Sequence, residues 1–296
     1  MSILVGVDGS EHADRALAWA LREAALRSAQ VTVINAFRVR ELAGPLNREE
    51  PHDEERAEAR RVVEEALGRV GSTAPGVDIT TTAVTGRAAA EAILHHGRHA
   101  DLIVVGSRGL GGFPGLLVGS VSQQVAAHAD VPVAVIPAGV EMTDVSDGTT
   151  SIVVGVDGSD KSIRALRWAV EEARLRDVPL TAVYVYRSLR EGSPFDAYAD
   201  VEESQLEELE RQGGGTALGK LDRLLSDAGD LSDIKIEREV DPGSPAKVLI
   251  SDAADESTLL VVGSRGHGGF SGLLLGSVSQ QCLHHAKGPV VVTPIG

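Results

Sequence analysis

The sequence has little of several residue types that commonly stabilise small proteins. It contains one cysteine, Cys282, so no disulfide can form within the chain. We therefore expect a reducing compartment and a small apolar role for this thiol. Aromatic residues make up only 3% of the chain, whereas hydrophobic residues make up 43%. The core must therefore be built from Val, Ile, Leu and Ala.

Long apolar runs and positive charge are also scarce. No stretch reaches the ~18 apolar residues that a membrane helix needs. The opening MSILVGVDGS lacks the basic and apolar regions of a signal peptide. The net charge is −15, which argues against a nucleic-acid or anionic-membrane surface because both require a basic patch. These absences predict a cytoplasmic protein whose partners include neither nucleic acid nor membrane.

The sequence does contain a duplication. ILVGVDGS at Ile3–Ser10 returns as IVVGVDGS at Ile152–Ser159. Each copy is as long as a whole domain, so we predict one domain at 1–139 and a second at 151–296. The polar segment 140–150 lacks apolar periodicity and is the predicted linker.

Each copy alternates short apolar strands with amphipathic helices. Strands that are almost entirely apolar are typical of a parallel sheet covered on both faces. This predicts an α/β fold of two tandem Rossmann-like domains, with ligands at the carboxyl ends of the strands. The predicted strands are 3–8, 31–37, 77–84, 102–105 and 131–136, then 152–157, 180–186, 234–240, 259–262 and 289–293. The predicted helices are 16–24, 54–70, 88–96 and 120–129, then 166–176, 202–226, 245–253 and 277–286.

A glycine-rich stretch follows the fourth predicted strand in both copies. VGSRGLGGFPGLLVGSVSQQ at 105–124 differs at only three positions from VGSRGHGGFSGLLLGSVSQQ at 262–281. A strand, a glycine loop and a helix in succession direct backbone N–H groups and the positive end of the helix dipole at one point, which attracts phosphate. We interpret both stretches as phosphate-binding loops; the alternative is that the glycines serve only for turns. Further hydroxyl donors in the first helical turn are Ser120, Ser122, Ser277 and Ser279.

Neither loop matches a standard hydrolytic or dinucleotide motif. The Walker A pattern requires a lysine that both copies lack, and the first strand ends in GVDGS rather than G-x-G-x-x-G. Phosphoryl transfer needs charge neutralisation and a group that orients the nucleophile, and each loop offers serines and one arginine. We therefore expect nucleotide binding with slow or absent hydrolysis, and we assign no catalytic residues.

Asp8 and Asp157 close the first strand of the two copies. Phosphates would repel a neighbouring carboxylate, so it must pair with a cation, hold a metal ion or contact the neutral part of a nucleotide. We favour contact with the neutral part; a local cap on the following helix is the alternative. Arg108 and Arg265, inside the glycine loops, either pair with phosphate or face water.

GVDGS after the first strand, together with G-2x-G-9x-G-S after the fourth, resembles the universal stress protein family. More narrowly, the two copies resemble its tandem-domain, ATP-binding actinobacterial members. The resemblance implies five parallel strands in each half, pairing of the halves through 131–136 and 289–293, and a homodimer of chains. It also implies ATP in two sites, with or without Mg. The expected function is nucleotide-dependent regulation of stress response or growth through an unknown protein partner. A slow ATPase or phosphotransferase is the alternative, and a cyclic nucleotide stays open as the ligand.

The nucleotide-contacting positions that the resemblance implies follow the motifs. In the first half they are Gly6, Val7, Asp8, Ala36, Gly106, Ser107, Arg108, Gly109, Gly119, Ser120, Val121 and Ser122. In the second half they are Gly155, Val156, Asp157, Val185, Gly263, Ser264, Arg265, Gly266, Gly276, Ser277, Val278 and Ser279. We predict no metal site, because adjacent helical histidines point about 100° apart. The histidine pairs to which this applies are His95-His96 and His284-His285.

Overall fold

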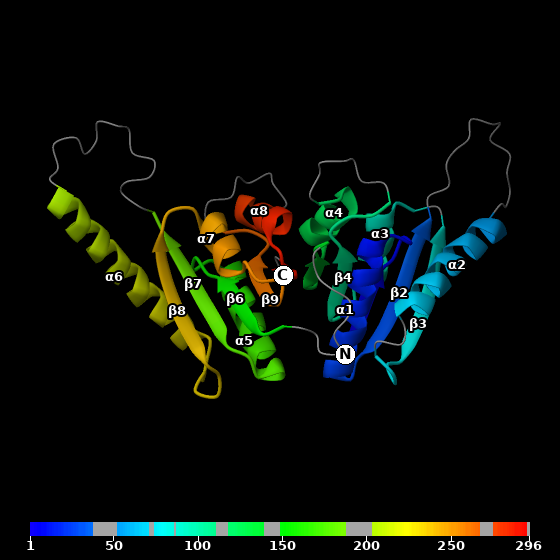
Figure 1. Cartoon of the computed structure of the whole chain (residues 1–296), viewed down its shortest axis with the longest axis horizontal. Coiled ribbons are helices and arrows are strands. Elements are labelled where there is room, and N and C mark those ends of the chain that lie inside the picture. The colour runs from blue at the N-terminus through cyan, green and yellow to red at the C-terminus, as the bar shows by residue number, and fades with distance from the viewer. Residues whose placement is uncertain are drawn as a thin grey trace.

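The computed structural model describes residues 1–37, 52–70, 74–85, 87–110, 118–138, 149–187, 203–266 and 275–294. These residues form two α/β halves that lie end to end (Figure 1). The first half contains β1 (Ser2–Gly6), α1 (Glu11–Arg27), β2 (Gln30–Phe37), α2 (His52–Val70), β3 (Ile79–Thr85), α3 (Ala89–Gly97), β4 (Leu102–Gly106), α4 (Ser120–His128) and β5 (Val133–Ile136). The second contains β6 (Ser151–Gly155), α5 (Asp160–Arg176), β7 (Leu180–Tyr186), α6 (Glu203–Asp227), β8 (Ile236–Pro242), α7 (Pro245–Asp252), β9 (Thr258–Gly263), α8 (Ser277–His285) and β10 (Val290–Thr293). Every predicted strand and helix is present, with shifted ends.

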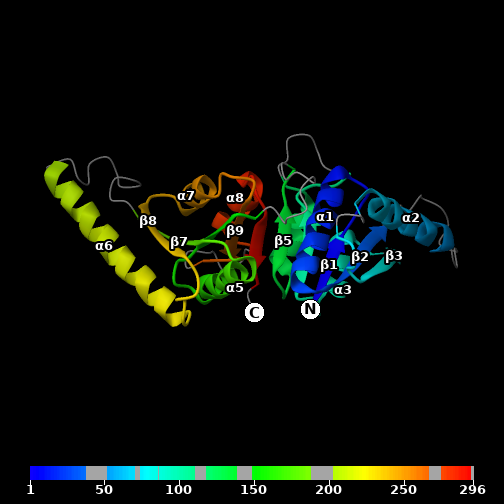
Figure 2. The same ribbon diagram turned by 60° about the horizontal axis from the view of Figure 1, so that its bottom comes forward.

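The halves share one ten-stranded sheet in the order β3-β2-β1-β4-β5-β10-β9-β6-β7-β8. The five strands of each half are parallel to one another. β5 and β10 are antiparallel, with Ala134 opposite Val291, and they join the halves at the centre of the molecule (Figure 2). The fold class and the pairing of the halves through their last strands are thereby confirmed.

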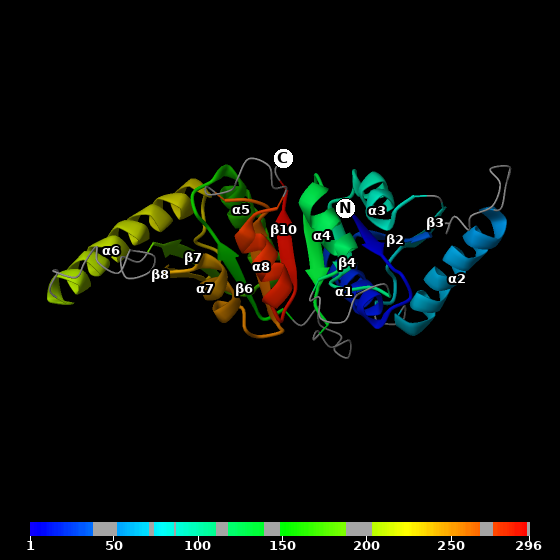
Figure 3. The ribbon, with the colours of Figure 1, turned by 90° about the horizontal axis from the view of Figure 1, so that it is seen from above.

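Two apolar layers cover the sheet. α1, α2, α5 and α6 pack on one face, and α3, α4, α7 and α8 pack on the other, where α4 and α8 flank the junction of the halves (Figure 3). The core is built mainly from Val, Ile, Leu and Ala, as the composition predicts. Cys282 is fully buried within it, and burial raises the pKa of its thiol to about 12. No helix in the described ranges is long and apolar enough to cross a membrane.

Only the end of the predicted linker falls within the described residues. Thr150 precedes β6, and its backbone N–H donates to the carbonyl of Ser257 at 3.0 Å. Residues 140–148 lie outside the described ranges, so the domain boundaries stay predictions.

Four charged side chains are buried where α1 meets α5, and we call them the Glu–Arg quartet. Arg27 Nη2 lies 2.5 Å from Glu172 Oε1, and Arg176 Nη2 lies 2.5 Å from Glu23 Oε2, both across the junction. Within each helix, Arg27 also contacts Glu23 and Arg176 contacts Glu172. No quartet side chain is more than 8% exposed. Burial raises the pKa of Glu172, although the two arginines oppose that shift.

α6 contains an unusual number of glycines for a helix. Gly213 and Gly214 lie against Tyr186, and a Cβ at Gly213 would be 3.3 Å from the Tyr186 ring. Gly219 differs, because a Cβ there would have no neighbour within 4 Å. Glycine inside a helix costs about 0.5–1 kcal/mol relative to alanine. We expect Gly219→Ala to raise the free energy of unfolding by that amount in urea denaturation; a decrease would contradict this account of α6.

An acidic cluster at one edge of the sheet consists of Glu239 and Asp241 on β8 and Asp252 at the end of α7. Burial, followed by the charges of Asp252 and Asp241, raises the pKa of Glu239 to about 7. The folded-state pKa lies above the ordinary value of 4.5, so this proton stabilises the fold at low pH. The contribution is lost as pH rises through about 7.

This acidic cluster predicts a pH-dependent gain of stability on neutralising one carboxylate. We expect Glu239→Gln to raise the free energy of unfolding by about 1 kcal/mol near pH 8, since solvent screens a partly exposed group. Near pH 3, well below the ordinary value of 4.5, the substitution should have little effect, because the wild-type group is then protonated in both states. Urea denaturation of both proteins at the two pH values measures the difference. An equal effect at both would show that titration of Glu239 is not the cause.

Candidate functional site

Each half has a cavity at the carboxyl ends of its strands. The cavity of the first half has a volume of about 200 Å³ and that of the second about 300 Å³. All the predicted site residues line these cavities except Ser107 and Ser264. Those two serines are buried, with 4% and 2% of their surface exposed. The structure thus brings the predicted residues together around one space in each half, and their contact with a ligand stays a prediction.

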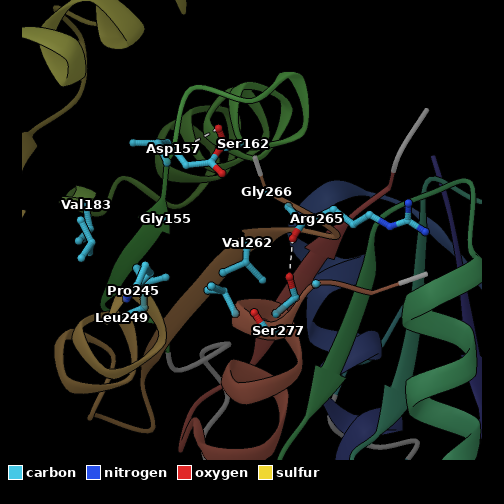
Figure 4. A pocket seen from close by; sticks show the side chains of 16 residues that line it. Gly155, Asp157, Ser162, Val183, Pro245, Leu249, Val262, Arg265, Gly266 and Ser277 are labelled. Carbon is cyan, nitrogen blue, oxygen red and sulfur yellow. Dashed lines mark hydrogen bonds between the residues drawn. The ribbon is translucent and has the colours of Figure 1, made fainter. Parts of the chain in front are cut away.

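Figure 4 shows how side chains enclose the second cavity. Asp157 lies at one side and Ser277 at the other, while Val183 and Leu249 form an apolar wall between them. Arg265 belongs to the lining, but its side chain extends away from these four residues. The cavity is therefore apolar along one wall and polar where the glycine loop begins its helix.

The helices that begin at the cavities lack side-chain caps. α4 and α8 start after Gly119 and Gly276, which have no side chain to accept a hydrogen bond. α1 and α5 are capped in the usual way, because the hydroxyls of Ser10 and Ser159 accept backbone N–H groups. The first amides of an α-helix have no acceptor within the helix. The cavities therefore meet bare, positively polarised helix ends that attract anions.

In the first half, contacts within the protein crowd two of the three motif glycines. A Cβ at Gly106 would lie 2.7 Å from the backbone oxygen of His12 in the first turn of α1. A Cβ at Gly109 would lie 2.2 Å from Asp8 Oδ2. At Gly119, by contrast, a Cβ would make only ordinary contacts, the nearest at 3.5 Å from Ser107 O. The glycines at 106 and 109 therefore make room for the protein's own atoms. The feature suited to an anion is the uncapped N-terminus of α4 after Gly119.

Asp8 lies beyond the end of β1 and bonds both to its own turn and to the glycine loop. Its Oδ1 accepts from the backbone N–H and the hydroxyl of Ser10 at 3.1 and 2.6 Å. Its Oδ2 accepts from the N–H of Leu110 at 2.8 Å. The strand ends at Gly6, two residues earlier than predicted, and the turn that follows contains Gly9 with a φ of +86°, a conformation that favours glycine. In this structure, therefore, Asp8 fixes the loop and also lines the cavity.

The second serine of each helix has a structural task that the sequence reasoning missed. Ser122 Oγ donates to the carbonyl of Gly106 at 2.6 Å, and Ser279 Oγ donates to that of Gly263 at 2.6 Å. The hydroxyl hydrogen is therefore engaged in holding the helix to the end of the strand. This leaves the backbone amides, rather than these hydroxyls, as donors toward the cavity.

Sequence reasoning also missed the apolar and helical walls of the cavities. They are formed in the first half by Ala13, Ile34, Ala89, Ile93 and Val105, and in the second by Ser162, Val183, Pro245, Leu249 and Val262. Ile34 and Val183 could have been predicted from the sequence. They lie two residues before Ala36 and Val185, and alternate residues of a strand share one face. Ser162 replaces Ala13, and its hydroxyl accepts from the N–H groups of Asp157 and Gly158.

Several histidines lie near the cavities or were considered as metal ligands, but none that the structure describes lines either cavity. Burial, then Arg15 and Arg108, lower the pKa of His12. His95 and His96 are exposed, whereas His284 is half-buried and contacts Gln123 Nε2 across the junction at 2.8 Å. In the described part of the chain, no group of three or more His, Cys, Asp or Glu side chains is placed to hold a metal ion.

Comparison with known proteins agrees with the fold and its duplication. The chain is 32% identical to a universal stress protein of Mycolicibacterium smegmatis, over 98% of this chain and 96% of that protein. It is also 32% identical to a universal stress protein of Mycobacterium tuberculosis, over 100% of this chain and 95% of that one. A crystal structure of a universal stress protein from Archaeoglobus fulgidus covers 100% of this chain and 98% of its own, with a TM-score of 0.67. The two sequences are only 20% identical, so this similarity is evidence for the fold and not for a shared function.

The family assignment rests on both halves. The sequence profile of the universal stress protein family matches residues 1–137 and again residues 148–294. Both matches include the GVDGS segment and the glycine-rich loop around which the cavities form. The chain therefore belongs to the universal stress protein family, as a member with two such domains in tandem.

Proposed function

We propose that each half binds one molecule of ATP and that the chain acts as a nucleotide-dependent regulator of stress response or growth. The observation that carries this proposal is the bare N-terminus of α4 or α8 at a cavity that also has apolar walls. Amides at the helix end suit the phosphates, and apolar walls suit the adenine base. The same combination occurs in both halves, so we propose two sites.

Each part of the nucleotide has a proposed position. The phosphates would meet the amides at 120–122 or 277–279, where each helix begins. The base would lie toward the ends of β2 or β7, where Ala36 and Val185 line the cavities. Mg, if required, would be carried by the phosphates, since the described residues contain no cluster placed to bind it.

The direct test is nucleotide binding to the whole chain. We expect purified protein, stripped of nucleotide, to bind two equivalents of ATP in isothermal titration calorimetry. A parallel titration with cyclic AMP shows whether the chain prefers ATP or a cyclic nucleotide. Failure to bind any adenine nucleotide at millimolar concentration would overturn the proposal.

A slow ATPase is the second candidate function. Arg108 and Arg265 belong to the linings and could favour it with their positive charge, but the Arg265 side chain would first have to turn toward Ser277. Neither loop has a lysine, so fast phosphoryl transfer is not expected. A turnover above roughly 1 per second, the low end for working enzymes, would favour the enzyme over the regulator.

A substitution of Asp8 tests the role of the carboxylate after the first strand in ATP binding. Asparagine has a single oxygen, so Asp8→Asn loses either the contact with Ser10 or the one with Leu110. We expect ATP affinity at the first site to fall about tenfold, the effect of one hydrogen bond to a charged group. Titration with and without Mg measures it; a loss seen only with Mg would instead assign Asp8 a metal-binding role.

Association between chains also remains a proposal. β5 and β10, the strands through which we expected domains to pair, already pair with each other inside one chain. A homodimer or a protein partner would therefore need another surface. Light scattering of the purified chain, with and without ATP, determines its oligomeric state.

A further inference from the structure

A second cavity of the first half runs along α3 to the C-terminal ends of α3 and α4, and none of its lining residues belongs to the proposed ATP site. It has a volume of about 290 Å³, similar to that of the second ATP cavity. Leu94, Gly97 and Ile103 form an apolar part of its lining. The charged and titratable groups that line it are Arg87, Glu91, His95, Arg98, His128 and Asp130. Two arginines and two histidines thus share the lining with two carboxylates, whereas the chain as a whole has a net charge of −15.

The side chains of this cavity have donors to offer a ligand. Arg87 pairs with Glu91, at 3.2 Å between Nη1 and Oε1. His128 Nδ1 lies 2.8 Å from the carbonyl of Gln124, which can only accept. Nδ1 therefore carries the hydrogen, and Nε2 is left for another partner. Arg98 is exposed, and its side chain makes no hydrogen bond or ion pair within the described residues.

Helix dipoles alone do not account for these cations. Cationic side chains are favoured at helix C-termini, and α3 and α4 both end here. α7 occupies the position of α3 in the second half, yet its last turn has no basic residue. Where α3 and its flank carry His95, His96 and Arg98, α7 and its flank carry Ser251, Asp252 and Ala254. The same dipole is thus tolerated without cations.

We infer that this cavity of the first half binds a small oxyanion bearing a phosphate or carboxylate group. The Arg98 guanidinium offers paired donors whose spacing matches two oxygens of such a group. His95 and His128 would add donors, and the apolar lining would accommodate a short carbon skeleton. The site is separate from the proposed ATP sites, because it shares none of their lining residues.

The anion should bind more tightly in mildly acidic solution. Histidine gains its positive charge between about pH 8 and pH 5, while the arginines stay charged. His96 lies beside the cavity, and burial, then His95 and Arg87, lower the pKa of its ring. A bound anion would oppose that shift. The charged groups that bear on the site are Arg87, Glu91, His95, His96 and Arg98 on the α3 side, and His128 and Asp130 on the α4 side.

The test follows histidine ring resonances by NMR while inorganic phosphate or acetate is added at constant ionic strength. We expect saturable shifts of His95 and His128, a higher apparent pKa of His96, and tighter binding near pH 6 than near pH 8. Arg98→Gln should weaken binding about tenfold, the effect of one charge-assisted hydrogen bond. Arg167→Gln, which removes an equal charge from the exposed side of α5 on the opposite face of the sheet, is the matched control and should leave binding unchanged.

Three outcomes would overturn the inference. Shifts that fail to saturate would indicate general ionic effects. Equal shifts in Arg98→Gln and the wild type would remove the guanidinium from the site. Loss of the shifts in Gly109→Ala, which alters the proposed ATP site, would assign the anion to that site. Loss of ATP binding with the histidine shifts intact would overturn only the proposed function. A response to phosphate alone or to acetate alone identifies which oxyanion the site prefers.

Discussion

Glu23→Gln is expected to lower the free energy of unfolding by about 3–5 kcal/mol, the cost of breaking a buried ion pair by removing one partner. Glu23 is fully buried and contacts Arg27 in its own helix and Arg176 across the junction of the halves. Without its charge, two buried guanidinium groups share only Glu172. Urea denaturation followed by circular dichroism measures the loss.

A matched control separates this effect from the simple loss of a charge. Glu208 pairs with Arg211 on α6, where the two side chains are 47% and 75% exposed. Exposed pairs contribute about 0–1 kcal/mol, so Glu208→Gln should change stability little. If Glu23→Gln cost no more than this control, the quartet would not be the electrostatic unit that its contacts indicate.

The quartet also makes a prediction of the opposite sign. Desolvation of buried ion pairs often cancels their attraction, so apolar residues of similar volume can be neutral or stabilising. We expect the fourfold replacement of Glu23 and Glu172 by leucine and of Arg27 and Arg176 by methionine to be far less harmful than Glu23→Gln alone. A fourfold variant less stable than the single variant would show that the charges contribute net stability.

Much of the fold could be predicted because duplication and apolar periodicity are local properties. Strands such as β4 and β10 are almost entirely apolar, and the sheet buries them on both faces. Most of the residues that line the cavities could also be predicted, because they lie where a strand ends and where the next helix begins. The pairing of β5 with β10 did not come from periodicity; it came from the family resemblance.

Other features depend on contacts between distant segments. Glu23 and Arg27 are spaced like an exposed ion pair on a helix surface, yet in the fold both are buried and contact Arg176 and Glu172 of α5. Gly106 looks like part of a ligand loop, whereas the backbone of His12 excludes a Cβ there. The task of Ser122 depends on the Gly106 carbonyl, sixteen residues away in sequence. A single sequence carries no direct record of such contacts.

Gly109→Ala and Gly266→Ala are expected to have the largest effect on nucleotide binding. A Cβ at these positions would lie 2.2 Å from Asp8 Oδ2 and 2.3 Å from Asp157 Oδ2, so the carboxylate and the loop must separate. Asp8 would then lose its contact with the N–H of Leu110, and the loop would shift from the helix end that we propose binds phosphate. One or two charge-assisted hydrogen bonds are at stake, which corresponds to a loss of about 10- to 100-fold in affinity.

Calorimetry of the two single variants and the double variant separates the sites. Each single variant should retain one tight equivalent of ATP and the double variant none, while circular dichroism shows the folded state. Gly219→Ala is the control, because a Cβ there meets no neighbour and the residue lies outside both cavities. If all variants bound two equivalents with unchanged affinity, the glycine loops would not be the phosphate sites. Loss of both equivalents in one single variant would instead show that the halves bind ATP cooperatively, since β5 and β10 join them into one sheet.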